Sequence, residues 1–310
     1  MNCTSLSWSS RLVYSLSPTV AVTSIAALIH TVFWIQVILF LSLRQRNIMW
    51  LYAYLITDLI LLARFFIFYF IRHWNLCLDP TVQLMLCYVE ATSKFYINIV
   101  QSYLLLALNV CRGAQIIFNR NVFIKDPYLI ILSHFLIYIL PALNIMIQVL
   151  ANCTILLNTS GESCDILYSS LAIEIFNIFI IYIIPVVLNL IVITFCIRHV
   201  SSVKDIHSQQ IINFRRKHKK TLLMQTIIFY SIWLILWSPN VLAFQFINVN
   251  TAAGIYISLL NYIEIGTDPF FVAVLDIRLF QSWKITWRKI KECRRRAITP
   301  VFPATVEQIH

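Results

Sequence analysis

Residues Ser169 to Ile197 read SSLAIEIFNIFIIYIIPVVLNLIVITFCI, and Glu174 is the only charged residue among them. Lipid cannot hydrogen-bond an exposed backbone, so a helix that crosses a membrane needs about 20 mostly apolar residues. This stretch therefore predicts a transmembrane helix. Six other stretches share its length and hydropathy and bring the predicted number of spans to seven: Pro18 to Leu43, Met49 to Phe70, Val82 to Cys111, Pro127 to Leu150, Thr221 to Phe246 and Thr251 to Leu275.

The composition of the whole chain agrees with this interpretation. Of its 310 residues, 60% are hydrophobic and 12% are charged, and the mean hydropathy is +0.79. Soluble domains have about 25% charged residues, and the apolar excess excludes a disordered chain. The spans lack the alternation of apolar and polar residues that a transmembrane β-barrel needs. The predicted fold class is an all-α membrane protein in which residues 18–275 form a seven-transmembrane helix bundle.

The basic residues predict the orientation of the bundle. Twenty of the 24 lysine and arginine residues fall in alternate connections between the spans or in the C-terminal segment. Cytoplasmic loops carry such an excess, so we expect a multi-pass protein of the plasma membrane whose N-terminus, residues 1–17, is extracellular. Topology and attraction to the anionic inner leaflet explain the net charge of +11. The expected partner is therefore the lipid bilayer, and no nucleic acid.

Glycosylation motifs and cysteines support the same orientation. Asn2, Asn152 and Asn158 begin the only Asn-x-Ser/Thr motifs, and all three fall on the predicted outer side, where such sites are used. Cysteines on that side meet oxidising conditions, and their odd number leaves at least one unpaired: Cys3, Cys77, Cys87, Cys153 and Cys164. No closely spaced set of Cys or His residues indicates a metal site.

Polar and ionisable residues recur on one face of the third span. Their spacing of three, four or eleven residues keeps them on one side of a helix: Glu90, Lys94, Asn98, Gln101 and Arg112. Ionisable groups are costly in lipid, so this face should look into the bundle. Packing contacts between helices would explain such residues as well as a binding site would. Glu90 and Lys94 lie one turn apart and could neutralise each other.

The seventh span carries a matching polar face with Asn261, Glu264 and Asp268. At about 1.5 Å of rise per residue, Lys94 and Glu264 each lie roughly 18 Å below the outer ends of their spans. We therefore expect these two side chains to meet across a central cavity. Trp237, beside the proline kink of the sixth span, should line the same cavity.

A second cluster of polar groups is expected deeper in the bundle, formed by Asp58, Gln101, Glu264 and Asp268. Three neighbouring carboxylates cannot all stay ionised in a low-dielectric site. Either at least one of them is protonated, or a cation such as sodium is bound. The sequence is equally consistent with both arrangements.

Arg64 lies in the second span at about the level of Glu90, and we expect the two to form an ion pair. Arg64 would then compete with Lys94 for a single carboxylate. The spare positive charge in the outer part of the bundle favours a ligand with an acidic group.

Several separated motifs, taken in order and at matching depths, resemble those of the rhodopsin-like (class A) G-protein-coupled receptors. The resemblance covers nearly the whole chain. It rests on Asp58 in the second span, Cys87 placed 25 residues before Arg112, Pro185 in the fifth span, Trp237-Ser238-Pro239 in the sixth and Asp268-Pro269 in the seventh.

This resemblance implies roles for individual residues. Cys87 would form a disulfide bond with Cys164, with Cys153 as the rival partner, and Arg112 would contact the α subunit of a heterotrimeric G protein when the sixth helix moves outward. The ligand would contact the family's central position, here Lys94, and the polar and aromatic groups around it: Glu90, Asn98, Trp237, Asn261 and Glu264. The family's sodium pocket would correspond to Asp58, Gln101, Glu264 and Asp268.

Departures from the family pattern concern the resting state. Cys111 stands where the family has an acid beside Arg112, and Val272 stands where it has a tyrosine. No asparagine occurs near His30 in the first span, and the fourth span lacks the usual tryptophan. High basal activity and a non-signalling decoy role therefore both stay open.

The C-terminal segment predicts a further element on the membrane surface. Residues 276–296 combine apolar side chains with eight basic ones, which is typical of an amphipathic cytoplasmic helix on the inner leaflet. Cys293 is either palmitoylated there or a free thiol. Residues 297–310 should form a cytoplasmic tail.

No nucleophile motif or metal triad indicates an enzyme, and a sodium ion is the only cofactor implied. A retinal protein would need a lysine in the seventh span, and residues 251–275 contain none. We therefore predict a G-protein-coupled receptor that binds an unidentified extracellular ligand, either a peptide or a small molecule. A channel or transporter is the main alternative, because intramembrane charges also mark ion paths.

Overall fold

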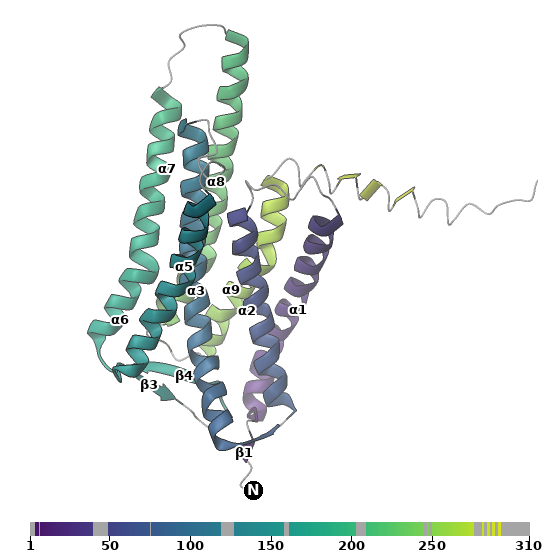
Figure 1. Ribbon diagram of the computed structural model, residues 1–310. Coiled ribbons are helices and arrows are strands. Elements are labelled where there is room, and N and C mark those ends of the chain that lie inside the picture. Colours follow the sequence, from purple (N-terminus) through teal and green to yellow (C-terminus); the bar gives the residue numbers. More distant parts are fainter. Residues whose placement is uncertain are drawn as a thin grey trace, which may run out of the picture.

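The computed structural model describes residues 4–5, 7–39, 49–74, 76–118, 127–157, 161–202, 209–244, 247 and 250–275, with isolated residues between 281 and 292. Long helices dominate these ranges and pack side by side as a bundle (Figure 1). In chain order they are α1 (Ser10–Leu39), α2 (Met49–His73), α3 (Pro80–Phe118), α5 (Pro127–Leu150), α6 (Leu171–Ile178), α7 (Ile184–Ser202), α8 (Gln209–Phe244) and α9 (Ala252–Leu275).

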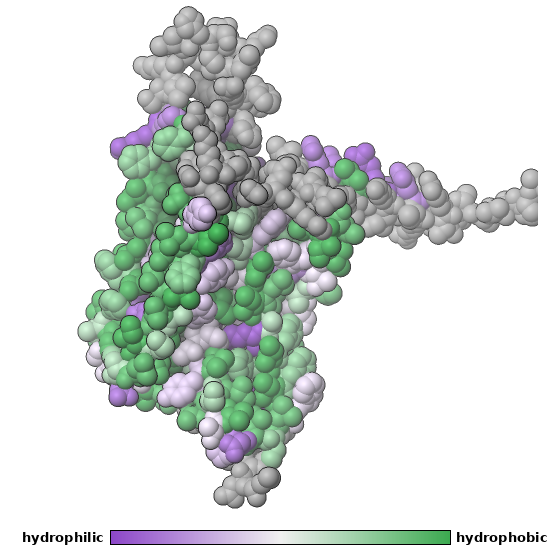
Figure 2. Space-filling view, in the orientation of Figure 1, coloured by the Kyte–Doolittle hydropathy of each residue, from purple (hydrophilic) through white to green (hydrophobic). Residues whose placement is uncertain are grey.

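Six helical runs in the described ranges are long and apolar enough to cross a membrane. They are Leu12–Leu39, Met49–His73, Pro80–Phe118, Tyr128–Leu150, Leu171–Ser201 and Lys219–Leu242. Large apolar side chains cover the outer surface of the bundle (Figure 2), whereas Asp58, Gln101 and Glu264 have no exposed surface. Water would favour the reverse arrangement. The chain is therefore an all-α, multi-pass membrane protein, as its composition predicts.

α9 is not one of these six runs, although it is 24 residues long. It packs against α1, α2 and α8. Gly266 allows a close approach to α1, because a Cβ atom at that position would lie 3.1 Å from the Cβ of Ala26. Nε2 of His30 in α1 forms a hydrogen bond of 2.9 Å with the carbonyl oxygen of Ile265. His30, which stands where the resemblance would place an asparagine, thus ties α1 to α9.

α6 and α7 form one continuous run that is joined by a π-helical turn, η3 (Phe179–Ile183). Pro185 follows this turn and has no backbone N–H to offer the preceding residues. The amide of Ile184 instead bonds the carbonyl of Phe179, five residues back. The widened turn therefore accommodates the proline ring without ending the helix.

Two short two-stranded sheets lie at the end of the bundle where the N-terminus lies (Figure 1). In one, β1 (Thr4–Ser5) pairs with β2 (Cys77–Leu78), and in the other β3 (Thr154–Leu157) pairs with β4 (Asp165–Tyr168), both antiparallel. A disulfide bond joins Cys87 of α3 to Cys164 next to β4. It anchors the hairpin of β3 and β4 to the first part of α3.

Candidate functional site

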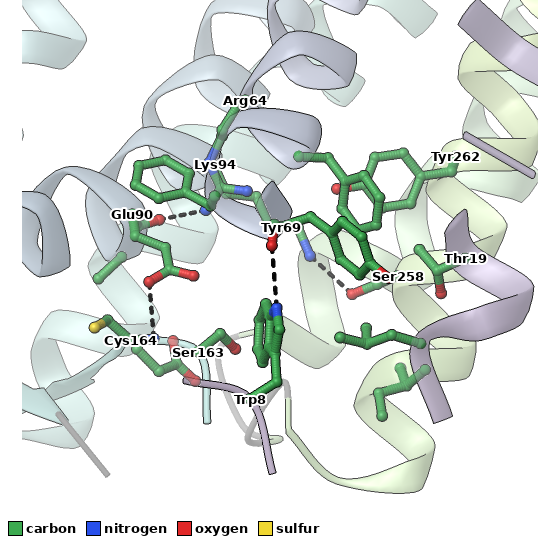
Figure 3. Close-up of a pocket in the computed structure, with 16 residues that line it drawn as sticks. Trp8, Thr19, Arg64, Tyr69, Glu90, Lys94, Ser163, Cys164, Ser258 and Tyr262 are labelled. Carbon is green, nitrogen blue, oxygen red and sulfur yellow. Dashed lines mark hydrogen bonds between the residues drawn. The ribbon is translucent and has the colours of Figure 1, made fainter. Parts of the chain in front are cut away.

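A cavity of about 100 Å³ opens between α1, α2, α3 and α9 at the end that carries the two-stranded sheets (Figure 3). We call it the outer cavity. Its charged lining residues are Arg64 of α2, Glu90 and Lys94 of α3, and Asp165 of β4. Aromatic and hydroxyl side chains complete the wall: Trp8, Phe65, Phe68, Tyr69, Ser258 and Tyr262.

Glu90 forms its ion pair with Arg72, and not with Arg64 as the sequence predicts. Arg72 is one of the most deeply buried cations of the described residues, with 2% of its surface exposed. Two of its guanidinium hydrogen bonds reach the Glu90 carboxylate, one of them from Nε to Oε1 at 3.3 Å, and a third reaches Sγ of Cys164 at 3.2 Å. The backbone N–H of Cys164 donates a further hydrogen bond of 3.2 Å to Oε2. The disulfide-linked hairpin thus helps to hold the Glu90 carboxylate in place.

Arg64 and Lys94 face the cavity with hydrogen bonds to neutral oxygens. Nε of Arg64 donates to Oγ of Ser93 at 2.6 Å, and its terminal nitrogen donates to the backbone carbonyl of Glu90. Nζ of Lys94 donates to Oγ of Ser258 in α9 at 2.8 Å. Lys94 therefore links α3 to α9 through a hydroxyl group.

The N-terminal segment closes the mouth of the outer cavity. Nε1 of Trp8 donates a hydrogen bond of 3.3 Å to the carbonyl of Tyr69, and the Arg72 guanidinium lies 5.0 Å from the centre of a Trp8 ring. The backbone amide of Ser9 also bonds the carbonyl of Gly161, at 3.0 Å. We call this arrangement the Trp8 lid; in Figure 3 the indole lies directly across from Tyr69.

A second group of buried polar side chains lies further along the same helices. We call it the inner cluster, and it consists of Tyr54, Asp58, Gln101, Glu264 and Asp268. The Tyr54 hydroxyl lies 2.7 Å from Oε1 of Glu264 and 2.7 Å from Oδ2 of Asp268. Nε2 of Gln101 donates to Oδ1 of Asp58 at 2.6 Å.

The geometry around Tyr54 limits where the protons are. A phenol carries one proton, so the Tyr54 hydroxyl can donate to only one of its two carboxyl neighbours. The other contact requires a proton on a carboxyl group or a cation that bridges the two oxygens. Oδ2 of Asp58 and Oε2 of Glu264 are buried, and neither has a hydrogen-bond partner among the described residues. Oε1 of Gln101 is likewise buried without a hydrogen-bond partner among the described residues. No set of three His, Cys, Asp or Glu side chains in the described ranges converges as a metal site.

The structure separates several residues that the sequence grouped together. Glu264 does not line the outer cavity with Lys94 but contacts Tyr54 in the inner cluster. Asn98 and Asn261 are buried, with 3% and 1% of their surfaces exposed, and neither lines the outer cavity. Trp237 is also fully buried, stacked between Trp233 at 4.2 Å and Tyr182 at 6.2 Å.

Four residues of the outer cavity and the inner cluster were not predicted from the sequence: Trp8, Tyr54, Asp165 and Ser258. Trp8 could not be found, because its position depends on how the N-terminal segment folds back over the bundle. Tyr54 was accessible to sequence reasoning, since it lies one turn before Asp58 on the same face of α2. Asp165 and Ser258 required the hairpin and α9 to be placed first.

Arg112 lies half-buried near the far end of α3. One turn earlier on α3, Asn109 donates a hydrogen bond of 2.7 Å to Asn189 of α7, and Asn189 donates one of 2.8 Å to the carbonyl of Pro185. Gly113 packs against α7 so closely that an added Cβ would lie 3.0 Å from Val192. α3 and α7 are thus firmly joined beside Arg112.

The cysteines near the outer cavity differ in their bonding. Cys87 pairs with Cys164, as the resemblance implies, and the rival Cys153 is a half-buried free thiol. Cys77 is also disulfide-bonded. Asn152 is exposed and adopts a left-handed conformation with φ 56°, which asparagine tolerates. The predicted sites at Asn2, Asn158 and Cys293 lie outside the described residues.

No protein-family model and no curated protein matches the chain. The assignment of a function therefore depends on the geometry of the outer cavity, the inner cluster and the helix ends.

Proposed function

We propose that the chain is a G-protein-coupled receptor, with α9 as its seventh membrane span and the outer cavity as its ligand site. The observation that carries this proposal is α9 itself. Ser258 of α9 contacts Lys94 in the outer cavity, and Glu264 and Asp268 of the same helix contact Tyr54 in the inner cluster. One rigid helix thus touches both polar regions of the bundle.

The polar residues of α9 are compatible with a membrane-spanning helix. Its polar side chains Asn261, Glu264 and Asp268 are 0 to 2% exposed and face the neighbouring helices. Buried polar groups lower the mean hydropathy of a helix without exposing any charge to lipid. At 24 residues, α9 has the length that a span needs.

The orientation follows from features at the two ends of the bundle. The disulfide bond, both two-stranded sheets and the exposed Asn152 lie at one end, where an oxidising extracellular medium preserves disulfides. Among the described basic residues, Arg112 and Arg198 lie near the opposite ends of α3 and α7. We infer a plasma-membrane receptor whose N-terminus faces the extracellular medium.

Signal transfer requires that a ligand bind two arrangements of the bundle with different affinities. A ligand that engages Lys94 competes with Ser258 and so changes the position of α9 relative to α3. The Pro239 kink and the stacked Trp233 and Trp237 give α8 a second place to bend. Outward movement of α8 would expose Arg112 to a G protein, and bound G protein would in turn tighten ligand binding.

A sodium ion or a shared proton in the inner cluster would stabilise the resting arrangement. Asp58 and Glu264 supply the free carboxylate oxygens for the ion. A ligand that moves α9 would separate Tyr54 from one of its two carboxyl partners. The inner cluster would then lose its proton or ion as the receptor becomes active.

A channel or transporter is the second candidate, because the inner cluster places three carboxyl groups in the middle of the bundle. An ion path would lead from the outer cavity past these groups. A decoy receptor is the third, since Cys111 and Val272 replace family residues that control the resting state.

The test measures nucleotide exchange on several G proteins in cells that express the full chain, with and without a ligand library. Arg112→Ala should abolish exchange, whereas Gln115→Ala, one turn further along α3, should leave it intact. Exchange that is absent under every condition would contradict the receptor proposal. A membrane current that disappears in Asp58→Asn would favour the channel.

A further inference from the structure

We propose that the outer cavity binds a small organic monoanion, a carboxylate attached to an apolar or aromatic skeleton, through Arg64 and Lys94. This inference rests on the proposed role of the outer cavity as a ligand site and names the chemistry of the ligand.

The charge balance around the cavity selects an anion. Arg64 and Lys94 in the lining, together with Arg72, which pairs with Glu90, supply three positive charges, and Glu90 and Asp165 in the lining supply two negative charges. Whatever the internal pairing, one positive charge is left in a region shielded from water. A bound monoanion neutralises it, whereas a bound amine would raise the local charge to two.

The two carboxylates are already committed to the protein. Glu90 accepts hydrogen bonds from Arg72 and from the backbone N–H of Cys164. Oδ1 of Asp165 accepts the backbone N–H of Ile166 at 2.9 Å. An amine ligand would share these carboxylate oxygens with the donors that already hold them.

Arg64 and Lys94, in contrast, can exchange partners at low cost. Nε of Arg64 and Nζ of Lys94 donate to the hydroxyl groups of Ser93 and Ser258, which can rotate to another partner when the cation moves to a ligand. The terminal nitrogen of Arg64 also donates to the backbone carbonyl of Glu90, and a ligand would compete with that bond. A guanidinium presents paired N–H groups that match both oxygens of a carboxylate. Arg64 and Lys94 approach the cavity from different helices and can hold one carboxylate between them.

The aromatic side chains in the cavity wall indicate the chemistry of the skeleton attached to the carboxylate. Phe65 and Tyr262 pack together with ring centres 5.2 Å apart, and Phe68 lies beneath the Arg64 guanidinium. These faces suit an apolar or aromatic skeleton. The closed cavity of about 100 Å³ holds only about three water molecules. A skeleton larger than the carboxylate therefore requires the Trp8 lid to move.

The experiment uses the purified full-length chain in lipid nanodiscs and two probes with the same carbon skeleton, phenylacetate and phenethylamine. Thermal unfolding is followed as a function of probe concentration, which reports binding without any G protein. Phenylacetate should raise the unfolding temperature in a saturable way, and phenethylamine should not. Equal stabilisation by both probes, or stabilisation by the amine alone, would overturn the proposal.

Three variants test the residues. Arg64→Gln should weaken phenylacetate binding by about tenfold or more, whereas the matched control Arg198→Gln, at the far end of α7, should not. Asp165→Asn removes a competing negative charge and keeps Oδ1 for Ile166, so it should tighten binding several-fold. Tighter binding cannot result from a damaged fold, so Asp165→Asn decides the question even if Arg64→Gln does not fold.

The outcomes separate this inference from the receptor proposal. Phenylacetate binding without nucleotide exchange would support the anion site and contradict the receptor. Exchange that responds to phenethylamine and not to phenylacetate would support the receptor and overturn the anion site. Unchanged or weaker phenylacetate binding in Asp165→Asn would also overturn it.

Discussion

The outer cavity and the inner cluster are built on the same helices, α2, α3 and α9, yet their charge balances are opposite. The outer cavity and its neighbour Arg72 together have three cations against two carboxylates. The inner cluster has three carboxyl groups, and the described side chains that hydrogen-bond to them are the neutral Tyr54 and Gln101. Positive charge thus gathers where a ligand can enter, and acidic groups gather where the bundle is sealed.

The two regions also differ in how their groups are held. Around the outer cavity, the exposed fraction varies from deeply buried Arg72 to half-buried Arg64, and the cations that face the cavity bond neutral hydroxyl and carbonyl oxygens. In the inner cluster, Asp58, Gln101 and Glu264 have no exposed surface. A region whose partners can be exchanged suits binding, whereas a sealed region with a shared proton or ion suits a two-state lock. The predictions below test this contrast in order of decreasing effect.

The largest effect is expected for Glu90→Ala, which would leave the buried Arg72 without its ion-pair partner. Breaking one side of a buried pair costs about 3–5 kcal/mol. The unfolding temperature of the chain in nanodiscs should fall strongly, and the double variant Glu90→Ala, Arg72→Met should recover much of the loss. A double variant that is as unstable as the sum of the two single variants would show that the pair has no coupled role.

The second effect concerns the inner cluster. Tyr54→Phe removes the hydroxyl that bridges Glu264 and Asp268 and should destabilise the chain by about 1–3 kcal/mol, because two buried carboxyl groups lose a partner. The control is Tyr103→Phe, which removes a half-buried hydroxyl that bonds the carbonyl of Ile180 at 3.0 Å. Tyr103→Phe should lower the free energy of unfolding by less than Tyr54→Phe does. Thermal unfolding in nanodiscs measures both, and an equal loss would contradict the special role of Tyr54.

The same contrast shows which contacts of the site can be predicted from the sequence alone. The polar face of α3 predicts that Glu90, Lys94 and Gln101 look into the bundle, and the structure confirms that they are buried there. Sequence spacing cannot decide between Arg64 and Arg72 as the partner of Glu90, since these residues lie about two turns apart on one face of α2. That choice depends on the hairpin and on Trp8, which approach Arg72 from outside the bundle.

The depth of Glu264 in the membrane, calculated from its residue number, is wrong for a similar reason. The calculation places Glu264 level with Lys94 because it assumes that the two spans start at the same height. In the structure the Lys94 partner is Ser258, six residues earlier in α9, and Glu264 lies deeper. A shift of that size along a helix axis is about 9 Å, and only the packing of α9 against α1 fixes it.

A third effect, smaller in free energy, concerns the Trp8 lid. Trp8→Ala removes one hydrogen bond and one cation–π contact and should cost about 1–2 kcal/mol of stability. It should also speed the association and dissociation of phenylacetate, because the mouth of the cavity stays open. Stopped-flow binding measures both rates, with Trp74→Ala as the control, since Trp74 is 66% exposed. Unchanged rates in Trp8→Ala would show that ligands enter by another route.

The smallest effect on stability is expected for Ser258→Ala, and it bears most directly on the contrast between the two regions. The hydroxyl of Ser258 is a neutral partner of Lys94, so its loss should cost less than about 1 kcal/mol of unfolding free energy. Removal of a competitor for Lys94 should leave phenylacetate binding unchanged or slightly tighter. Thr267→Ala is the matched control on the same helix, because its hydroxyl bonds only the Glu264 backbone carbonyl at 2.9 Å among its described contacts. A marked loss of phenylacetate binding in Ser258→Ala, with none in Thr267→Ala, would mean that the hydroxyl positions Lys94 for the ligand and that the outer cavity is as fixed as the inner cluster.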